Sequence, residues 1–269
     1  MVHTGSNPQQ NAVAVIPARY SSTRLPGKPL LPIAGKPLIV WVAERAAAAK
    51  TISRTIVATD DARIFDAVNA AGFDAAITRA DHLSGTDRIA EVAHNLRAPI
   101  IVNVQGDEPL IDPETIDRAV GALIKDPHAQ MATTYESIAA ADDVSNPSVV
   151  KIAIDEHGYA VGFSRQPIPF NQAAAQHGST PGSPDQSGLL FSFRKHTGLY
   201  AYRREFLLQF AAWPPGQAER QESLEQLRAL ERGVKIRAVE AASPSIGVDT
   251  PEDLERVRAI VERGNRVAV

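Results

Sequence analysis

The chain has 269 residues, of which 44% are hydrophobic and 22% are charged, and it carries a net charge of −3 and no cysteine. These values fit one soluble α/β domain with a substantial core. The weak negative charge argues against a general nucleic-acid-binding protein, and the lack of cysteine excludes disulfides, thiolate metal sites and cysteine nucleophiles. No apolar run approaches the ~20 residues of a membrane span, so we expect a cytoplasmic protein without a membrane partner. Residues 1–11 are polar and are expected to form a disordered tail.

In the first half, short Val- and Ile-rich runs alternate with amphipathic stretches. The apolar runs predict strands, and the stretches between them predict helices. Strands alternating with helices at this spacing indicate a mostly parallel, Rossmann-like sheet with helices on both faces. The predicted strands are 12–17, 54–60, 75–78 and 99–104, and the predicted helices are 38–50, 61–71 and 86–96.

The pattern changes after about residue 129. Strands become more frequent, and a segment rich in Gln, Ala, Gly, Ser and Pro at 171–187 is expected to be a surface loop. We expect one domain over 12–263, in which 130–205 form a smaller, strand-rich substrate or dimerisation subdomain. The predicted strands are 129–135, 149–154, 159–164, 199–203 and 234–239, and helices are predicted near 219–231 and from Pro251.

The segment 17–37 is basic and free of acidic residues, since the first Asp or Glu of the chain is Glu44. It leaves the carboxyl end of the first strand, where open α/β sheets bind ligands. A basic loop with glycine at this place is typical of a polyphosphate site. A solvated basic loop is an equal alternative, and a transit peptide is a weaker one because a buried strand lies within the region. The loop is neither a Walker loop nor GxGxxG.

Two aspartates are candidates for a metal site, because each precedes a helix that already has its own cap residue. The QGDEP loop (105–109) comes directly after the strand 99–104 and carries Asp107. The next helix already has Asp112 as its cap, so Asp107 is free to hold Mg²⁺. Asp249 lies before the last helix, where Thr250, Pro251 and Asp253 form a capping-box-like start. The alternatives are a turn residue for Asp107 and, favoured on local sequence alone, a helix-start acid for Asp249.

Further candidates suit a polyhydroxylated ligand that carries a carboxylate. They lie in the segments FSR (163–165), KHTGLY (195–200) and ESLEQLR (222–228). Arginine pairs with a carboxylate through two hydrogen bonds. Taken singly, each residue has a structural alternative: His196 as a core histidine, and Glu222 and Glu225 as exposed helix residues.

Seven segments occur in a characteristic order: IPARYSSTRLPGKPL, IVATDD, TRADHLSGTDRIAE, NVQGDEP, FSRQPIP, ESLEQLR and GVDTPEDLERVR. Together they make the chain, from about Val13 to Arg258, resemble the 3-deoxy-manno-octulosonate (Kdo) cytidylyltransferases. The resemblance implies a nucleotide-diphospho-sugar transferase fold and a homodimer. It also implies formation of CMP-Kdo and pyrophosphate from CTP and Kdo, with Mg²⁺, for lipopolysaccharide synthesis.

The resemblance also implies roles for single residues. Arg19 and Lys28 would hold the CTP phosphates, and Asp107 and Asp249 would bind Mg²⁺; these four would be the catalytic residues. The nucleotide side would comprise Pro17, Ala18, Arg19, Ser22, Arg24, Lys28, Thr78, Arg79, Ser84, Gly85 and Gln105. The Kdo side would comprise Gln105, Arg165, His196, Tyr200, Glu225 and Gln226.

The chain departs from the family pattern in two places. The segment 171–192 is longer than is usual, and Thr197 replaces an aliphatic residue. Three rival functions stay open at this point. The first is a cytidylyltransferase for another ulosonic acid, such as sialic acid or an 8-amino Kdo analogue. The others are a nicotinamide-dependent oxidoreductase, against which the missing GxGxxG counts, and a sensor that binds CTP without turnover.

Overall fold

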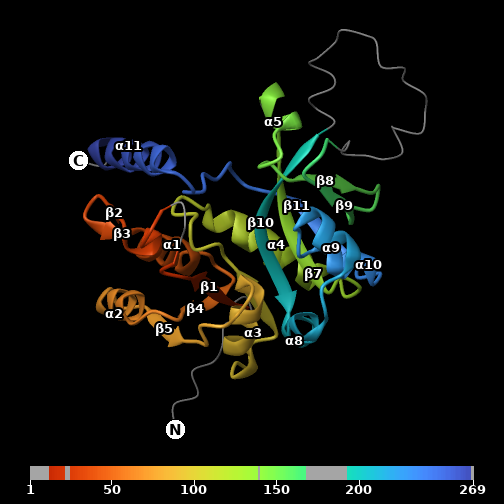
Figure 1. Ribbon diagram of the computed structural model, residues 1–269, viewed down its shortest axis with the longest axis horizontal. Coiled ribbons are helices and arrows are strands. Elements are labelled where there is room, and N and C mark those ends of the chain that lie inside the picture. The colour runs from red at the N-terminus through yellow and green to blue at the C-terminus, as the bar shows by residue number, and fades with distance from the viewer. Residues whose placement is uncertain (1–11, 22–24, 139, 168–192, 268–269) are drawn as a thin grey trace.

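The computed structural model describes residues 12–21, 25–138, 140–167 and 193–267, which form a mixed β-sheet with helices on both faces (Figure 1). The strands are β1 (Ala12–Ala18), β2 (Pro32–Ile33), β3 (Lys36–Pro37), β4 (Ile52–Thr59), β5 (Asp74–Ile77), β6 (Ile100–Asn103), β7 (Met131–Ser137), β8 (Lys151–Ile154), β9 (Ala160–Ser164), β10 (Arg194–Arg203) and β11 (Ile236–Glu240). The helices are η1 (Lys28–Leu30), α1 (Leu38–Ala47), α2 (Ala62–Ala70), α3 (Gly85–His94), α4 (Pro113–Lys125), α5 (Ala141–Ser145), α8 (Arg204–Ala212), α9 (Gln217–Glu222), α10 (Leu227–Glu231) and α11 (Pro251–Val267).

The main sheet has the strand order β11-β7-β10-β6-β1-β4-β5 within the described residues, and the hairpin β8–β9 joins it through β10. β1 pairs in parallel with β4 and β6, β4 with β5, and β11 with β7. β10 is antiparallel to both β6 and β7. This topology confirms the predicted mostly parallel, Rossmann-like sheet.

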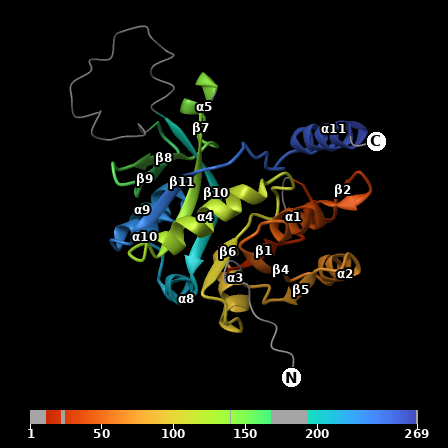
Figure 2. The same cartoon turned by 180° about the vertical axis from the view of Figure 1, so that it is seen from behind.

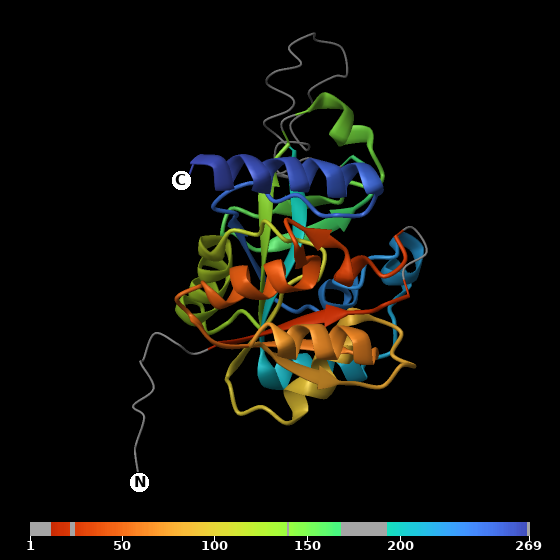
Figure 3. The same ribbon diagram turned by 90° about the vertical axis from the view of Figure 1, so that its left-hand side faces the viewer.

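Alternate side chains of β1 enter two different cores. Ala14 and Ile16 pack with residues of α1, α2 and α4, whereas Val13 and Val15 pack with residues of α3 and α8. Figures 2 and 3 show the corresponding helices on opposite sides of the sheet. A strand that is apolar on both faces is expected where both faces of a parallel sheet are covered, so the sequence of β1 already indicates its central position.

The structure differs from the sequence predictions at several elements. The helix predicted over 219–231 is two short helices, because Ser223 between them has a φ of 54°. β10 is longer than predicted, and the hairpin β2–β3 and the helices α5 and α8 were not predicted. β7 and β10 belong to the main sheet. The contribution of residues 130–205 to a substrate or dimerisation subdomain stays a prediction. The predicted tail 1–11 and the loop 171–187 lie outside the described residues.

Within the described ranges, no helix combines the length and the apolar character needed to cross a bilayer.

Candidate active site

Two loops meet at the carboxyl edge of the sheet, one after β1 and one after β6. The strands run in parallel with Val15 opposite Asn103, so both chains leave the sheet on the same side. A Cβ added at Gly106 would lie 2.6 Å from the carbonyl oxygen of Pro17. Real side chains do not tolerate this distance, so glycine at 106 is what allows the QGDEP loop to lie against the basic loop.

The ammonium of Lys28 joins three segments that are far apart in the sequence. Its Nζ donates to Oδ2 of Asp107 at 2.8 Å, to the carbonyl oxygen of Val248 at 2.9 Å and to Oδ1 of Asp249 at 3.2 Å. The lysine side chain is 16% exposed, against 33% for Asp107 and 51% for Asp249. The two carboxylates therefore converge on one cation at the surface of a cavity.

The backbone brings Asp249 to this point. The amide of Val248 donates to the carbonyl oxygen of Asp107 at 2.8 Å. Thr250 and Asp253 cap α11 reciprocally: the amide of Asp253 donates to the Thr250 hydroxyl at 3.2 Å, and Asp253 Oδ2 accepts from the Thr250 amide at 3.1 Å. The predicted capping pair is confirmed, and the Asp249 carboxylate is not part of it.

The helix after the QGDEP loop likewise has its own cap. Asp112 accepts from the amide of Glu114, with Pro113 at the first helical position, as predicted. Glu108 lies beside Asp107, and its carboxyl group is enclosed although the residue is partly exposed. Desolvation, followed by the charge of Asp107, raises the pKa of Glu108 to about 8. A protonated Glu108 adds no third negative charge next to the two aspartates.

A cavity of about 400 Å³ lies over these groups. Its floor is the carboxyl edge of the sheet, and both cations and both carboxylates predicted for this site reach it. The lining residues are Pro17, Ala18, Arg19, Ser21, Lys28, Pro29, Gln105, Gly106, Asp107 and Asp249. The structure thus brings together the four residues named as catalytic. Ser22 and Arg24, also named for the nucleotide side, lie outside the described residues.

A larger cavity of about 890 Å³ lies between α4 and β11. Two of its polar side chains, Asp117 and Arg118, are bound to main-chain groups of the protein. Asp117 accepts from the amides of Lys50 and Thr51, and Arg118 donates to carbonyl oxygens at 240 and 241. It also lies away from the carboxyl edges of β1 and β6, so we assign chemistry to the smaller cavity.

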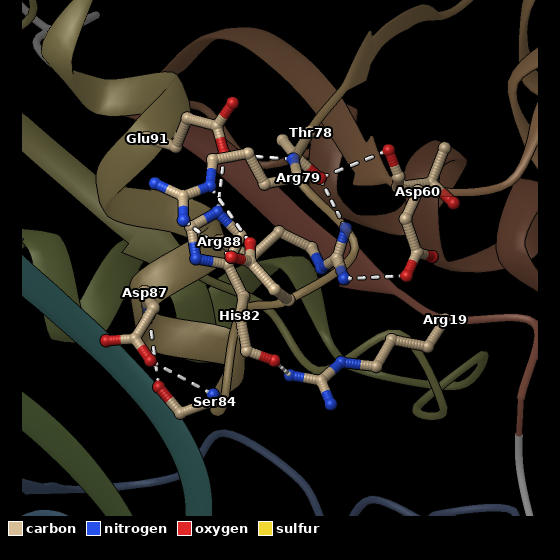
Figure 4. A network of polar contacts seen from close by, with 11 residues as sticks. Arg19, Asp60, Thr78, Arg79, His82, Ser84, Asp87, Arg88 and Glu91 are labelled. Carbon is tan, nitrogen blue, oxygen red and sulfur yellow. Dashed lines mark hydrogen bonds and ion pairs between the residues drawn. The ribbon is translucent and has the colours of Figure 1, made fainter.

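The loop between β5 and α3 carries the residues predicted for the cytidine side (Figure 4). It is tied to the basic loop because Arg19 donates to the carbonyl oxygen of His82 at 2.8 Å. Ser84 caps α3 in a capping box with Asp87, and Gly85 lies against Pro17. Thr78 is buried, whereas Arg79 is exposed and paired with Asp81. The loop therefore adjoins the cavity, with Thr78 turned into the protein.

Arg88 of α3 binds the start of this loop from the interior of the protein, and it was not among the predicted site residues. Its side chain is completely buried and donates to the Thr78 hydroxyl and, at 3.1 Å, to Oδ2 of Asp60 (Figure 4). Thr78 in turn donates to the carbonyl oxygen of Thr59 at 3.1 Å. A charged residue on the apolar side of α3, four residues after a helix cap, is the sequence signal that could have indicated this buried ion pair.

Arg165 lies at the end of β9, beside α9. Its Nε donates to the carbonyl oxygen of Glu222 at 3.0 Å, and its Nη1 donates to that of Pro147 at 3.0 Å. The Glu222 carboxylate accepts from the Arg165 amide and from the Ser164 hydroxyl, both at 3.1 Å. Within the described residues, these bonds hold the guanidinium by carbonyl oxygens and leave further N–H donors for a ligand.

His196 is buried on β10, as its structural alternative predicted. The Thr133 hydroxyl donates to the carbonyl oxygen of Leu199, so it accepts from His196 Nε2 at 2.8 Å, which places the proton on Nε2. Burial lowers the pKa of His196 to about 3, so the ring is neutral at pH 7. The ring packs on Tyr200 at 5.2 Å, and burial raises the pKa of that tyrosine.

Gln105 connects this strand to the cavity. Its Nε2 donates at 3.0 Å to the carbonyl oxygen of Gly198, which lies in an irregular stretch of β10 at a φ of 79°. Thr197, the departure from the family pattern, bonds to Thr134 on β7 through its hydroxyl. Its hydroxyl is therefore used inside the sheet.

Glu225 is not the exposed helix residue of the structural alternative. Its carboxylate accepts from the Thr86 hydroxyl at 2.5 Å and pairs with Arg228 at 3.4 Å, and burial raises its pKa. Gln226 is buried beside it. Of the Kdo-side candidates, Gln105 lines the cavity, while Arg165, His196, Tyr200, Glu225 and Gln226 lie outside its lining.

Comparison with known proteins agrees with this geometry. The profile described as cytidylyltransferase matches residues 13–236. The 3-deoxy-manno-octulosonate cytidylyltransferase of Geobacter sulfurreducens is 51% identical over 92% of this chain and 98% of its own length, and that of Pseudomonas syringae is 50% identical over 92% and 97%. A solved CMP:2-keto-3-deoxy-manno-octonic acid synthetase complexed with CTP superimposes with a TM-score of 0.84 at 44% identity, covering 94% of this chain and 99% of that one. The chain belongs to the cytidylyltransferase family, among the 3-deoxy-manno-octulosonate cytidylyltransferases.

Proposed function

We propose that this enzyme converts CTP and Kdo into CMP-Kdo and pyrophosphate in the cavity over Lys28. The observation that carries the proposal is the convergence of Lys28, Asp107 and Asp249, which come from three distant segments, at the carboxyl edge of the sheet. Such a cluster, next to Arg19 and in a cytidylyltransferase, suits the triphosphate of CTP. Relatives that share half of the residues carry the Kdo activity in their names.

The two aspartates fit a magnesium ion. Both present a carboxylate oxygen to the same ammonium, at 2.8 Å and 3.2 Å, so one cation can contact both. Mg²⁺ prefers carboxylate and phosphate oxygens and retains several waters, so two protein ligands are enough. When bound, it would neutralise phosphate charge and lower the pKa of the attacking hydroxyl. Lys28 would then be free to pair with phosphate oxygens.

The reaction asks the protein mainly for position and charge. The anomeric hydroxyl of Kdo gives its proton to water and bonds to the α-phosphorus, while the bond from that phosphorus to the bridging oxygen breaks and pyrophosphate leaves. Arg19 and Lys28 would bind phosphate oxygens and stabilise the negative charge that the leaving group gains. Gln105 would orient the sugar, since it links the cavity to β10.

Arg165 is our candidate for the Kdo carboxylate. Its guanidinium is held at two N–H groups by carbonyl oxygens, which restrict it without neutralising it. A preorganised guanidinium pairs with a carboxylate through two parallel bonds. His196 and Tyr200, whose rings are in contact, would form part of the wall on the sugar side. We also expect the enzyme to be cytoplasmic. We expect it to be a homodimer, and light scattering on the purified protein would check its oligomeric state.

The decisive experiment is pyrophosphate release with CTP or UTP combined with Kdo or sialic acid, with and without Mg²⁺. We expect release with CTP, Kdo and Mg²⁺ together. Equal turnover of sialic acid would favour the rival hypothesis of a cytidylyltransferase for another ulosonic acid. Full activity after thorough chelation would contradict the metal assignment.

A further inference from the structure

A completely buried ammonium lies close to the candidate sugar site. The side chain of Lys151, on β8, is 0% exposed. Its Nζ donates to three main-chain carbonyl oxygens: Asn146 at 2.9 Å, Val149 at 2.7 Å and Arg165 at 2.7 Å. An ammonium has three N–H donors, so all of them are used.

Burying the Lys151 ammonium lowers the stability of the fold unless its hydrogen bonds compensate, so we ask what the three bonds hold in place. Removing a charged group from water costs several kcal/mol, and methionine would fill a similar space without that cost. The three bonds offset the cost only while the three carbonyl oxygens keep their places. Lys151 therefore fixes the relative position of the 146–149 turn and of Arg165.

Lys151 and the 146–149 turn restrain Arg165 at its main chain and at its guanidinium. Its main-chain carbonyl accepts from Lys151, and its guanidinium Nη1 donates to Pro147, which lies within the 146–149 turn. Glu222 completes the arrangement by accepting from the Arg165 amide and from its Nε. The Lys151 ammonium thus fixes the main chain of Arg165 and also the 146–149 turn to which the Arg165 guanidinium donates.

We propose that Lys151 is a positioning residue for Kdo: it presets the Arg165 guanidinium to receive the carboxylate of the sugar. The inference rests on the function proposed above for Arg165. A bidentate pair requires both N–H groups in line with both oxygens, so a small shift of the turn weakens it. Lys151 acts through Arg165 and does not itself touch the sugar.

The test is a double-variant cycle in the complete enzyme with Mg²⁺. It compares wild type, Lys151→Met, Arg165→Lys and the double variant by the KM for Kdo and the KM for CTP. Losing a charge-assisted hydrogen bond corresponds to roughly a tenfold to hundredfold weaker interaction. We expect Lys151→Met to raise the KM for Kdo by about tenfold or more. We expect the KM for CTP to stay within about twofold, because the CTP cavity is lined by other residues.

The double variant separates positioning from general support of the fold. If Lys151 acts through Arg165, the double variant should have the KM for Kdo of Arg165→Lys alone, because the two effects are not additive. Ile154→Val is the matched control, since Ile154 is buried on the same strand and its loss of a methyl group weakens packing. It should leave both KM values unchanged.

Several results would overturn the proposal: an unchanged KM for Kdo in Lys151→Met, equal rises for Kdo and CTP, or multiplying effects in the double variant. If Lys151→Met does not fold, Lys151→Gln takes its place: its shorter side chain has two N–H donors for the three carbonyl acceptors, so at least one acceptor loses its partner and the KM for Kdo should still rise. A wild-type KM for Kdo in this variant would contradict the proposal. If Arg165→Lys alone leaves the KM for Kdo unchanged, the role of Arg165 fails instead.

Discussion

Lys28 and Asp107 are separated by 79 residues and form an ion pair of 2.8 Å at the carboxyl edge of the sheet. The pair places the ammonium where a metal ion would contact the same carboxylate. Lys28 is therefore both the internal counter-ion of the aspartates and, in our proposal, a phosphate ligand. Its removal should affect metal binding, stability and catalysis in different directions.

We expect Lys28→Ala to lower kcat/KM for CTP by about 10²–10³, since a charge stabiliser of the leaving pyrophosphate is lost. Without metal, Asp107 and Asp249 repel each other, so the Tm should fall by about 2–4 °C, a small loss because the pair is partly exposed. Mg²⁺ should restore the Tm, and it should bind more tightly without CTP because no ammonium competes.

Calorimetric Mg²⁺ titration and thermal unfolding check these three effects. Lys125→Ala is the control, because Lys125 is an exposed lysine at the end of α4. Unchanged CTP kinetics in Lys28→Ala would contradict the phosphate role. Mg²⁺ affinity equal to that of wild type would contradict the competition.

Asp249→Asn should reduce activity by roughly two or more powers of ten, since it removes one metal carboxylate while keeping the size of the side chain. Its metal-free stability should change by less than about 1 kcal/mol, because the lost pair with Lys28 is half exposed and α11 keeps its cap.

Asp253→Asn is the opposite case and serves as control. Asp253 accepts from the amides of Asp249 and Thr250, so its loss should cost about 0.5–2 kcal/mol of stability with most of the activity retained. Pyrophosphate release and urea unfolding on both variants distinguish the two roles. A stable, fully active Asp249→Asn enzyme would exclude Asp249 from the metal site.

The sequence predicts well what depends on local pattern. The β1 and β6 strands, the caps at Asp112 and Thr250, and the convergence of two loops follow from apolar runs, cap residues and the geometry of parallel strands. It does not predict contacts that depend on distant segments. Nothing local to Lys151 indicates its three carbonyl acceptors. The position of Arg88 on the apolar side of α3 signals burial, but it does not identify Asp60 and Thr78 as the partners, because these are supplied by the tertiary fold.

The difference between local pattern and tertiary contacts also explains where the sequence predictions were wrong. Glu225 occupies a helical pattern that allows exposure, but in the fold its carboxylate accepts from Thr86 of α3 and pairs with Arg228. The helix predicted over 219–231 breaks at Ser223, whose left-handed conformation no propensity indicates. The roles of the Kdo-side residues stay predictions, because the arrangement around bound sugar depends on substrate.

His196 should make the stability of the enzyme depend on pH in acid. Its pKa falls to about 3 in the folded protein, below its ordinary value of 6.5, so the unfolded chain binds more protons between those values. Stability is then complete above pH 6.5 and decreases as the pH falls. By linkage, this residue accounts for about 2 kcal/mol of loss between pH 7 and pH 5.

We expect His196→Gln to have a flatter dependence by about that amount, measured as the free energy of unfolding in urea at pH 7, 6 and 5. His128→Gln is the control, because His128 is exposed in the turn after α4. An identical pH dependence in wild type and His196→Gln would show that His196 is not the residue that titrates.

Gly106→Ala tests the meeting of the two loops directly. The new Cβ would lie 2.6 Å from the carbonyl oxygen of Pro17, a backbone atom that moves only with β1, and 3.5 Å from Ile39. The QGDEP loop must shift away, which carries Asp107 away from Lys28. Overpacking of this kind costs about 1–3 kcal/mol, and a displacement near 1 Å at the reacting groups can cost about 10² in rate.

Gly121→Ala is the matched control, because Gly121 lies in α4 and the added Cβ would meet no described atom within 4 Å apart from its chain neighbours and its own helix backbone. Alanine there should stabilise the helix by up to about 1 kcal/mol and leave activity unchanged. We therefore expect the two substitutions to move stability in opposite directions and only Gly106→Ala to lose activity, measured by urea unfolding and CTP-dependent pyrophosphate release. Wild-type kinetics in Gly106→Ala would mean that the loops need not touch for catalysis, since the displaced Asp107 would still serve.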